Sequence, residues 1–259
     1  MKKGLALVLV LMLALTVSSA LAEDLLDRIQ ARGELVIGTE ADWAPWTYYN
    51  EDFELVGLDV EIGTMIAEGL GVKPVFMKAD FDFILAGVEG GRFDIGCNGV
   101  GYTPTRAESF AFSTPYLFTP SVLVVHLDNE DIHSLEDLQG RKTANSPAST
   151  YAQLAVSLGA DVQYVNTLSE TIMLLEQGRV EATINSKSSI ELYLEQHPEA
   201  KIKIVSEFPG DPVAYPMRKG EDSARLVERV NEILQAARED GRLAAISVKY
   251  FGADLTNPE

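Results

Sequence analysis

The sequence GRFDIGCN occupies residues 91–98, and a related sequence, GRVEATIN, occupies residues 178–185. Corresponding residues of the two stretches lie 87 positions apart. In each case a helical pattern stops at a glycine, and a short apolar stretch typical of a strand follows and ends at an asparagine. A repeated segment of this kind predicts two copies of one β-α-β unit.

The same alternation of elements extends on both sides of each segment. In the first half we expect strands at 34–38, 73–77 and 93–97 and helices at 58–70 and 81–88. In the second half we expect strands at 142–145, 162–165 and 180–185 and helices at 150–158 and 169–177. Alternating strands and helices favour an α/β fold in which crossover helices join parallel strands.

Two extended stretches, 118–125 and 208–217, follow the two halves, and a long amphipathic helix is expected at 223–240. If this last segment returns to the first lobe, the chain crosses between lobes twice. Two crossings form a hinge with a cleft beside it, where small molecules bind in such folds. The predicted division is residues 23–119 and 213–259 for the first lobe and residues 120–212 for the second.

The N-terminus has the features of a secretory signal peptide. Lys2 and Lys3 precede an apolar run at 5–17, and a group of small residues ends at Ala22. The alternative is a membrane anchor, but the run is shorter than the ~20 residues of a spanning helix, so we expect cleavage after Ala22. No cysteine near this site indicates a lipid anchor. The mature protein is expected to be soluble and periplasmic or secreted.

Composition excludes several functions. The net charge of −18 makes nucleic acid and anionic membranes poor partners. The single cysteine, Cys97, permits no internal disulfide, and we expect it to be buried. His126, His133 and His197 lack metal-ligand spacing, and neither a nucleophile motif nor a nucleotide-binding loop is present. We therefore expect a binding protein, not an enzyme, with no cofactor and no bound metal.

An anion site is expected after the third strand of the first half. Gly99 and Gly101 let backbone N–H groups turn toward one point, and Thr103 can cap a helix that starts at Pro104. Arg106, in the first turn of that helix, adds a planar set of donors that suits a carboxylate. The alternative is a solvated arginine on a helix surface.

Other candidate residues also follow predicted strands. Ser149 and Thr150 stand at the start of a helix in the second half, where they could meet the same anion or form an ordinary helix cap. Trp43 and Phe81 could form flat walls for a ligand side chain, or could pack in the core.

Five stretches of the chain carry a resemblance to a known family: RGELVIGTEADWAPW, LVGLDVEIGTMIAEGLGVK, GRFDIGCNGVGYTPTRAESFAFSTPY, EQGRVEATIN and DGRLAAISVKYFG. Over essentially all of the mature chain, it resembles family 3 of the bacterial extracellular solute-binding proteins, the amino-acid receptors of ABC importers. The resemblance implies two Rossmann-like lobes joined by a two-segment hinge, the periplasmic-binding-protein type II architecture, closing on a small-molecule ligand. It also implies an ABC transporter permease in the membrane as partner, and a monomer.

The resemblance further implies a role for each candidate residue. Arg106 resembles the arginine that pairs with the α-carboxylate of the ligand. The other positions implied are Glu40 for a polar or cationic side chain, Trp43 and Phe81 around that side chain, Asn98, Gly99 and Gly101 at the head group, and Ser149 and Thr150 at the carboxylate.

Two positions depart from the family pattern. Gly101 replaces the usual hydroxyl residue, and Ser186, followed by Lys187, replaces the aspartate that holds the α-ammonium. If Ser186 faces the ligand, it is a weaker partner for an ammonium than a carboxylate. One alternative is therefore a receptor for a carboxylate without an α-amine. A separate alternative, which the resemblance leaves open because some relatives of this fold perform dehydration, is an enzyme with Glu40 as its acid or base.

Overall fold

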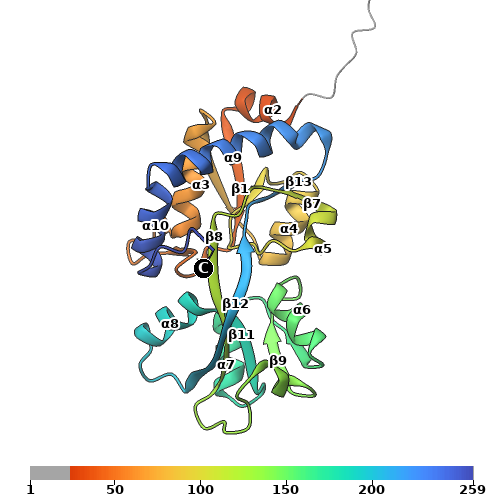
Figure 1. The fold of residues 1–259 in the computed structure, drawn as a ribbon, viewed down its shortest axis with the longest axis vertical. Coiled ribbons are helices and arrows are strands. Elements are labelled where there is room, and N and C mark those ends of the chain that lie inside the picture. The colour runs from red at the N-terminus through yellow and green to blue at the C-terminus, as the bar shows by residue number, and fades with distance from the viewer. Residues whose placement is uncertain (1–23, 259) are drawn as a thin grey trace, which may run out of the picture.

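A computed structural model describes residues 24–258 and shows two α/β lobes, one above the other in Figure 1. The predicted signal peptide, residues 1–22, lies outside the described residues. No helix within 24–258 is long and apolar enough to cross a membrane.

The first lobe contains a five-stranded sheet of order β5-β1-β6-β13-β7. Strand β1 pairs in parallel with β5 and β6, and β13 runs antiparallel to β6 and β7. The strands of this sheet are β1 (Glu34–Thr39), β5 (Lys73–Lys78), β6 (Ile95–Gly96), β7 (Phe110–Phe112) and β13 (Pro216–Arg218). The accompanying helices are α2 (Leu25–Arg32), α3 (Leu58–Gly69), α4 (Phe81–Glu89), α5 (Pro104–Ser109), α9 (Ala224–Glu239) and α10 (Arg242–Phe251). A small sheet of β2 (Asp42–Trp43), β3 (Thr47–Tyr49) and β4 (Leu55–Val56) lies between β1 and α3 in the chain.

The second lobe repeats this plan with the order β10-β9-β11-β8-β12. Its strands are β8 (Leu117–His126), β9 (Lys142–Asn145), β10 (Asp161–Tyr164), β11 (Ala182–Ser186) and β12 (Ile202–Val213). Its helices are α6 (Thr150–Ser157), α7 (Leu168–Glu176) and α8 (Lys187–Gln196), and it contains a short 3-10 turn at Leu135–Leu138, while a second such turn, Glu221–Ser223, precedes α9 in the first lobe. Helix α7 begins and ends 87 residues after α4, the spacing of the sequence repeat.

The apolar pattern of each strand decides which faces are buried. In β8, Val122 and Val124 belong to one core cluster, and Leu123 and Val125 belong to another. Because successive side chains of a strand point to opposite faces, this continuous apolar run packs against helices on both sides of the sheet. Cys97 is fully buried in the core of the first lobe, as predicted.

The C-terminal helices complete the core of the first lobe. Leu226 and Val230 of α9 and Leu243 of α10 are buried in the same cluster as Leu35 of β1. The chain therefore passes into the second lobe and returns to the first.

Strands β8 and β12 make the two crossings between lobes, side by side in Figure 1. They pair antiparallel from Leu117 opposite Val213 to His126 opposite Ile202. The predicted lobe boundaries, after residues 119 and 212, fall within this paired ribbon. At its first-lobe end, Tyr116 and Tyr215 stack with ring centroids 4.3 Å apart, and both hydroxyl groups donate to the buried carboxylate of Asp59.

Candidate ligand-binding site

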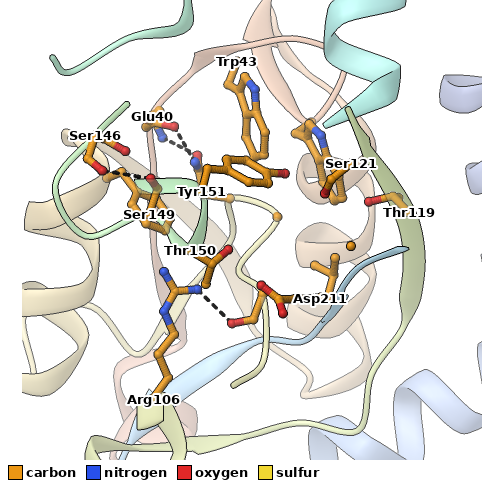
Figure 2. Close-up of a pocket in the computed structure, with 17 residues that line it drawn as sticks. Glu40, Trp43, Arg106, Thr119, Ser121, Ser146, Ser149, Thr150, Tyr151 and Asp211 are labelled. Carbon is orange, nitrogen blue, oxygen red and sulfur yellow. Dashed lines mark hydrogen bonds between the residues drawn. The ribbon is translucent and has the colours of Figure 1, made fainter. Parts of the chain in front are cut away.

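A cavity lies between the lobes beside the β8–β12 ribbon, with an empty volume of about 580 Å³ when the mouth open to solvent is included (Figure 2). Nine of the ten predicted ligand-binding residues line it: Glu40, Trp43, Phe81, Asn98, Gly99, Gly101, Arg106, Ser149 and Thr150. The remaining lining residues are Trp46, Thr119, Ser121, Ser146, Tyr151, Gly210, Asp211 and Val213.

Arg106 is held rigidly at one end of the cavity. Thr103 caps helix α5 by accepting from the Arg106 backbone N–H, and proline occupies the first turn. The buried guanidinium donates to the carbonyl of Gly101 at 2.8 Å and lies over the Phe81 ring, 5.6 Å from its centroid. Burial lowers the pKa of Arg106 from its usual value, although Asp211 opposes this shift. Two of the five guanidinium N–H groups bond to backbone carbonyls, which leaves donors for a ligand.

Ala148, in the second lobe, connects both lobes through its peptide groups. Its carbonyl accepts from Arg106 at 2.6 Å, and its N–H donates to the Asp82 carboxylate at 2.6 Å. Asp82 lies on α4 of the first lobe, next to Phe81. The structure therefore shows the lobes in contact across the cleft.

The aromatic wall of the cavity consists of Trp43 and Trp46, whose rings stack 5.2 Å apart at an interplanar angle of 11°. Gly99 passes close to both rings with φ of +55°, and a Cβ atom there would lie 2.7 Å from Trp43 and 2.9 Å from Trp46. Only glycine combines this backbone conformation with so close an approach. Trp46 is fully buried, so Trp43 is the more available surface for a ligand.

Glu40 and Asn98 form a polar pair elsewhere on the cavity wall. The Asn98 amide donates to the Glu40 carboxylate, and the Glu40 backbone N–H donates to the Asn98 side-chain oxygen at 2.9 Å. Burial raises the pKa of Glu40 to about 7, while the Asn98 hydrogen bond acts in the opposite direction. Near neutral pH this carboxyl can therefore change its charge on meeting a cationic group.

This shift predicts a pH dependence of stability. A carboxyl whose pKa rises from 4.5 to about 7 on folding contributes stability that is complete below pH 4.5. That contribution is lost as the pH rises through 7. Relative to the wild type, the ligand-free Glu40→Gln variant is expected to gain about 1–3 kcal/mol of unfolding free energy between pH 4.5 and pH 8. Urea denaturation of both proteins at several pH values in this range measures the difference in unfolding free energy. A difference that stays constant with pH would contradict the raised pKa of Glu40.

Sequence reasoning missed the residues that the crossing strands and Tyr151 contribute. Thr119 and Ser121 of β8 and Asp211 of β12 lie along the ribbon, and Tyr151 points toward Ser121, with which it shares a hydrogen bond (Figure 2). Burial raises the pKa of Tyr151, so its hydroxyl stays protonated. The alternating polar residues at 119 and 121 were the available signal, because one face of the ribbon had to border the cleft.

Ser186 is the one predicted residue that does not line the cavity. It ends β11 opposite Ser121, and its hydroxyl is fully buried without a hydrogen-bond partner among the described residues. Lys187 forms ion pairs with Glu207 at 2.7 Å and Glu191 at 3.9 Å. The expectation that Ser186 faces the ligand is therefore corrected.

Residues 24–258 contain no cluster of three or more His, Cys, Asp or Glu side chains that could hold a metal ion. The polar and aromatic groups that line the cavity are hydroxyls, aromatic rings, the Asn98 amide, one guanidinium and two carboxyls, Glu40 and Asp211. This set can bind a small polar molecule that carries both signs of charge.

Three known proteins illustrate what the chain is similar to. A probable amino-acid ABC transporter-binding protein of Haemophilus influenzae is 38% identical over 91% of this chain and 91% of its own length. The structure of an ancestral arginine-binding protein bound to arginine is 36% identical, with a TM-score of 0.79 over 85% of this chain and 99% of that one. The unliganded, open L-cystine solute receptor of Neisseria gonorrhoeae is also 36% identical, with a TM-score of 0.58 over 90% of this chain and 98% of that one.

Residues 35–253 match the profile of one family, which covers both lobes and the cavity between them. The predicted type II architecture is confirmed by this match and by the structural neighbours. The chain belongs to family 3 of the bacterial extracellular solute-binding proteins.

Proposed function

We propose that this protein is the exported receptor of an ABC importer and captures an amino acid in the cavity between its lobes. The observation that carries the proposal is the buried guanidinium of Arg106, which keeps unused donors at a cavity that the first turn of α6, starting at Thr150, borders from the other lobe. The Ser149 hydroxyl caps this helix, because it accepts from the Ala152 N–H and donates to the Ser146 carbonyl. A planar guanidinium beside the N-terminus of a helix is suited to an α-carboxylate. The name of the Haemophilus relative supports the transport role.

The far part of the cavity favours a ligand with a polar or cationic end. Trp43 offers a flat apolar face, and Glu40 can become a carboxylate when a cation approaches it. Two similar structures, those of an arginine-binding protein and an L-cystine receptor, support this substrate class. L-arginine and L-cystine both carry a second cationic group and are therefore the first ligands to test.

Closure of the hinge is supported by the comparison of lobe arrangements. The two solved structures share the same sequence identity with this chain, yet the ligand-bound one superposes with a TM-score of 0.79 and the open one with 0.58. A different angle between lobes lowers this score without changing the fold. The contacts of Ala148 with Arg106 and Asp82 are those of a closed cleft.

A thermal-shift screen tests the proposed function. At a ligand concentration 100 times the dissociation constant, a specific ligand stabilises the folded protein by about 2.7 kcal/mol. For a chain of this size the melting temperature is expected to rise by about 5–10 °C. The screen compares L-arginine, L-cystine and L-glutamine with their D-isomers as controls. The absence of a shift with all three L-amino acids would refute this substrate class, and equal shifts with both isomers would refute specific recognition of an amino-acid head group.

Two further measurements distinguish a receptor from an enzyme. Small-angle scattering is expected to give a smaller radius of gyration with the best ligand of the screen. The reason is that β8 and β12, the two connections between the lobes, form a hinge about which the lobes can close. Prolonged incubation with that ligand is expected to return it unchanged by mass spectrometry. A new product would assign catalysis to the cavity.

A further inference from the structure

We propose that Asp211, on the crossing strand β12, is the carboxylate that holds the α-ammonium of the ligand. We further propose that the absence of a side chain at Gly101 provides the space that the Asp211 side chain occupies. The inference rests on the proposed function, since it requires a ligand with an amine. It accounts for both departures from the family pattern, because the carboxylate absent at Ser186 is supplied from the hinge.

The position of Asp211 follows from an irregularity in the ribbon. The register between β12 and β8 shifts between Pro209 and Pro212, which is a bulge that surrounds Asp211. A bulge turns a side chain away from its regular direction. The loop of the first lobe is tied to the same point, because the Tyr102 N–H donates to the Pro212 carbonyl at 2.7 Å and Gly101 bridges to Val213.

The Asp211 carboxylate is available for a ligand. Within residues 24–258 it has no hydrogen-bond or ion-pair partner, and it lines the cavity (Figure 2). Burial lowers the pKa of Arg106 and the negative charge of Asp211 opposes this shift, yet the two side chains form no ion pair within 4.0 Å. Figure 2 shows both groups directed to the space beside Thr150. We therefore assign the carboxylate of an amino-acid head group to Arg106 and its ammonium to Asp211.

Gly101 and Asp211 are sterically matched. A Cβ atom at position 101 would lie 2.9 Å from the Asp211 Cβ and 3.2 Å from its Oδ2. The first distance is shorter than carbon atoms tolerate, so any larger residue at 101 displaces Asp211. The missing hydroxyl at this position is therefore the condition that lets a carboxylate approach from β12.

The other carboxyl of the cavity is poorly placed for this role. Glu40 is bonded to Asn98 and lies on the opposite side of the cavity from Arg106 in Figure 2. A head group held by Arg106 leaves Glu40 for the distal end of the ligand. Asp211 and Glu40 then bind two different cationic groups of one molecule.

The test compares each amino acid with its analogue that lacks the α-amine. The probes are L-arginine with guanidinovalerate and L-cystine with dithiodipropionate, and binding is measured by calorimetry. Asp211→Asn is expected to weaken binding of the amino acid about 10- to 150-fold, the equivalent of one charge-assisted hydrogen bond. It is expected to change the affinity for the desamino analogue less than threefold, because that analogue has no group for Asp211 to hold.

Glu207→Gln provides the charge control, because it removes one negative charge from the same strand at an exposed residue outside the cavity lining, together with the ion pair of that residue with Lys187. Its affinities are expected to equal those of the wild type. Gly101→Ala is a second variant that leaves both charges in place, and it is expected to weaken amino-acid binding at least tenfold by displacing Asp211. Melting curves verify that all variants fold.

The outcomes separate this inference from the proposed function. Wild-type protein that binds none of the amino acids refutes the proposed function, and this inference with it. Wild-type protein that binds an amino acid, together with an Asp211→Asn variant that binds it equally well, refutes only the role of Asp211. Equal losses for the amino acid and its desamino analogue would also refute the role, since Asp211 would then shape the cavity without contacting the amine.

Discussion

Arg106→Ala is expected to abolish high-affinity binding, with a loss of about 2–5 kcal/mol, or about 30-fold to several thousand-fold in the dissociation constant. The variant removes the buried donor of the carboxylate pair and also the interlobe bond to the Ala148 carbonyl. Both losses weaken the closed state that holds the ligand. Calorimetric titration with the best amino acid of the thermal screen gives the measurement.

Two further variants show what the Arg106 loss means. Arg106→Lys keeps the charge but not the planar fork, so it is expected to recover only part of the affinity. Arg92→Ala removes an exposed arginine of the same lobe that is not part of the cavity lining, and it is expected to bind normally. An Arg106→Ala protein with an intact melting transition and near-wild-type affinity would remove Arg106 from the site.

Asp59→Ala is expected to lower the free energy of unfolding by about 3–5 kcal/mol. The fully buried Asp59 carboxylate accepts hydrogen bonds from the hydroxyls of Tyr116 and Tyr215 and from the Gly99 N–H. The alanine variant leaves all three donors buried without a partner. Urea denaturation at pH 7, beside an exposed control such as Asp52→Ala, provides the comparison.

The pH dependence of this loss distinguishes a buried carboxyl from a simple packing defect. Burial raises the pKa of Asp59 to about 6, so its contribution to stability is complete below 3.8 and declines as the pH rises through 6. The difference between the wild type and Asp59→Ala should therefore be larger at pH 4 than at pH 8. A loss below 1 kcal/mol at both pH values would show that the three donors find other partners.

The sequence predicted the repeated α/β elements well because glycines end the helices and apolar runs mark the strands. The strand predicted at 142–145 coincides with β9, and the helix predicted at 81–88 differs from α4 by one residue. Helix α8 was missed because its apolar side is narrow, with only Ser189 and Ile190 buried. Strands β2 and β4 have two residues each, too few for any pattern to show.

Local sequence motifs predicted the site residues that lie at the ends of strands. They did not predict which side chains of the crossing strands β8 and β12 face the cavity. Arg106, Ser149 and Thr150 follow strand ends, which meet at one edge of each sheet, and the cavity brings them together. Asp211 was not predicted because the direction of its side chain depends on a β-bulge, and a bulge cannot be predicted from the pattern of apolar residues. Ser186 was misplaced because alignment with a family gives a position in the chain, while the local strand geometry buries that side chain.

The return of the chain to the first lobe affects the order in which the protein can fold during synthesis. Residues of α9 and α10 fill the same core as β1, so the first lobe lacks part of its interior until nearly the whole chain has been made. The second lobe draws its sheet and its core clusters from one continuous segment and can form earlier. The part of the protein that is synthesised first is therefore the part that is completed last.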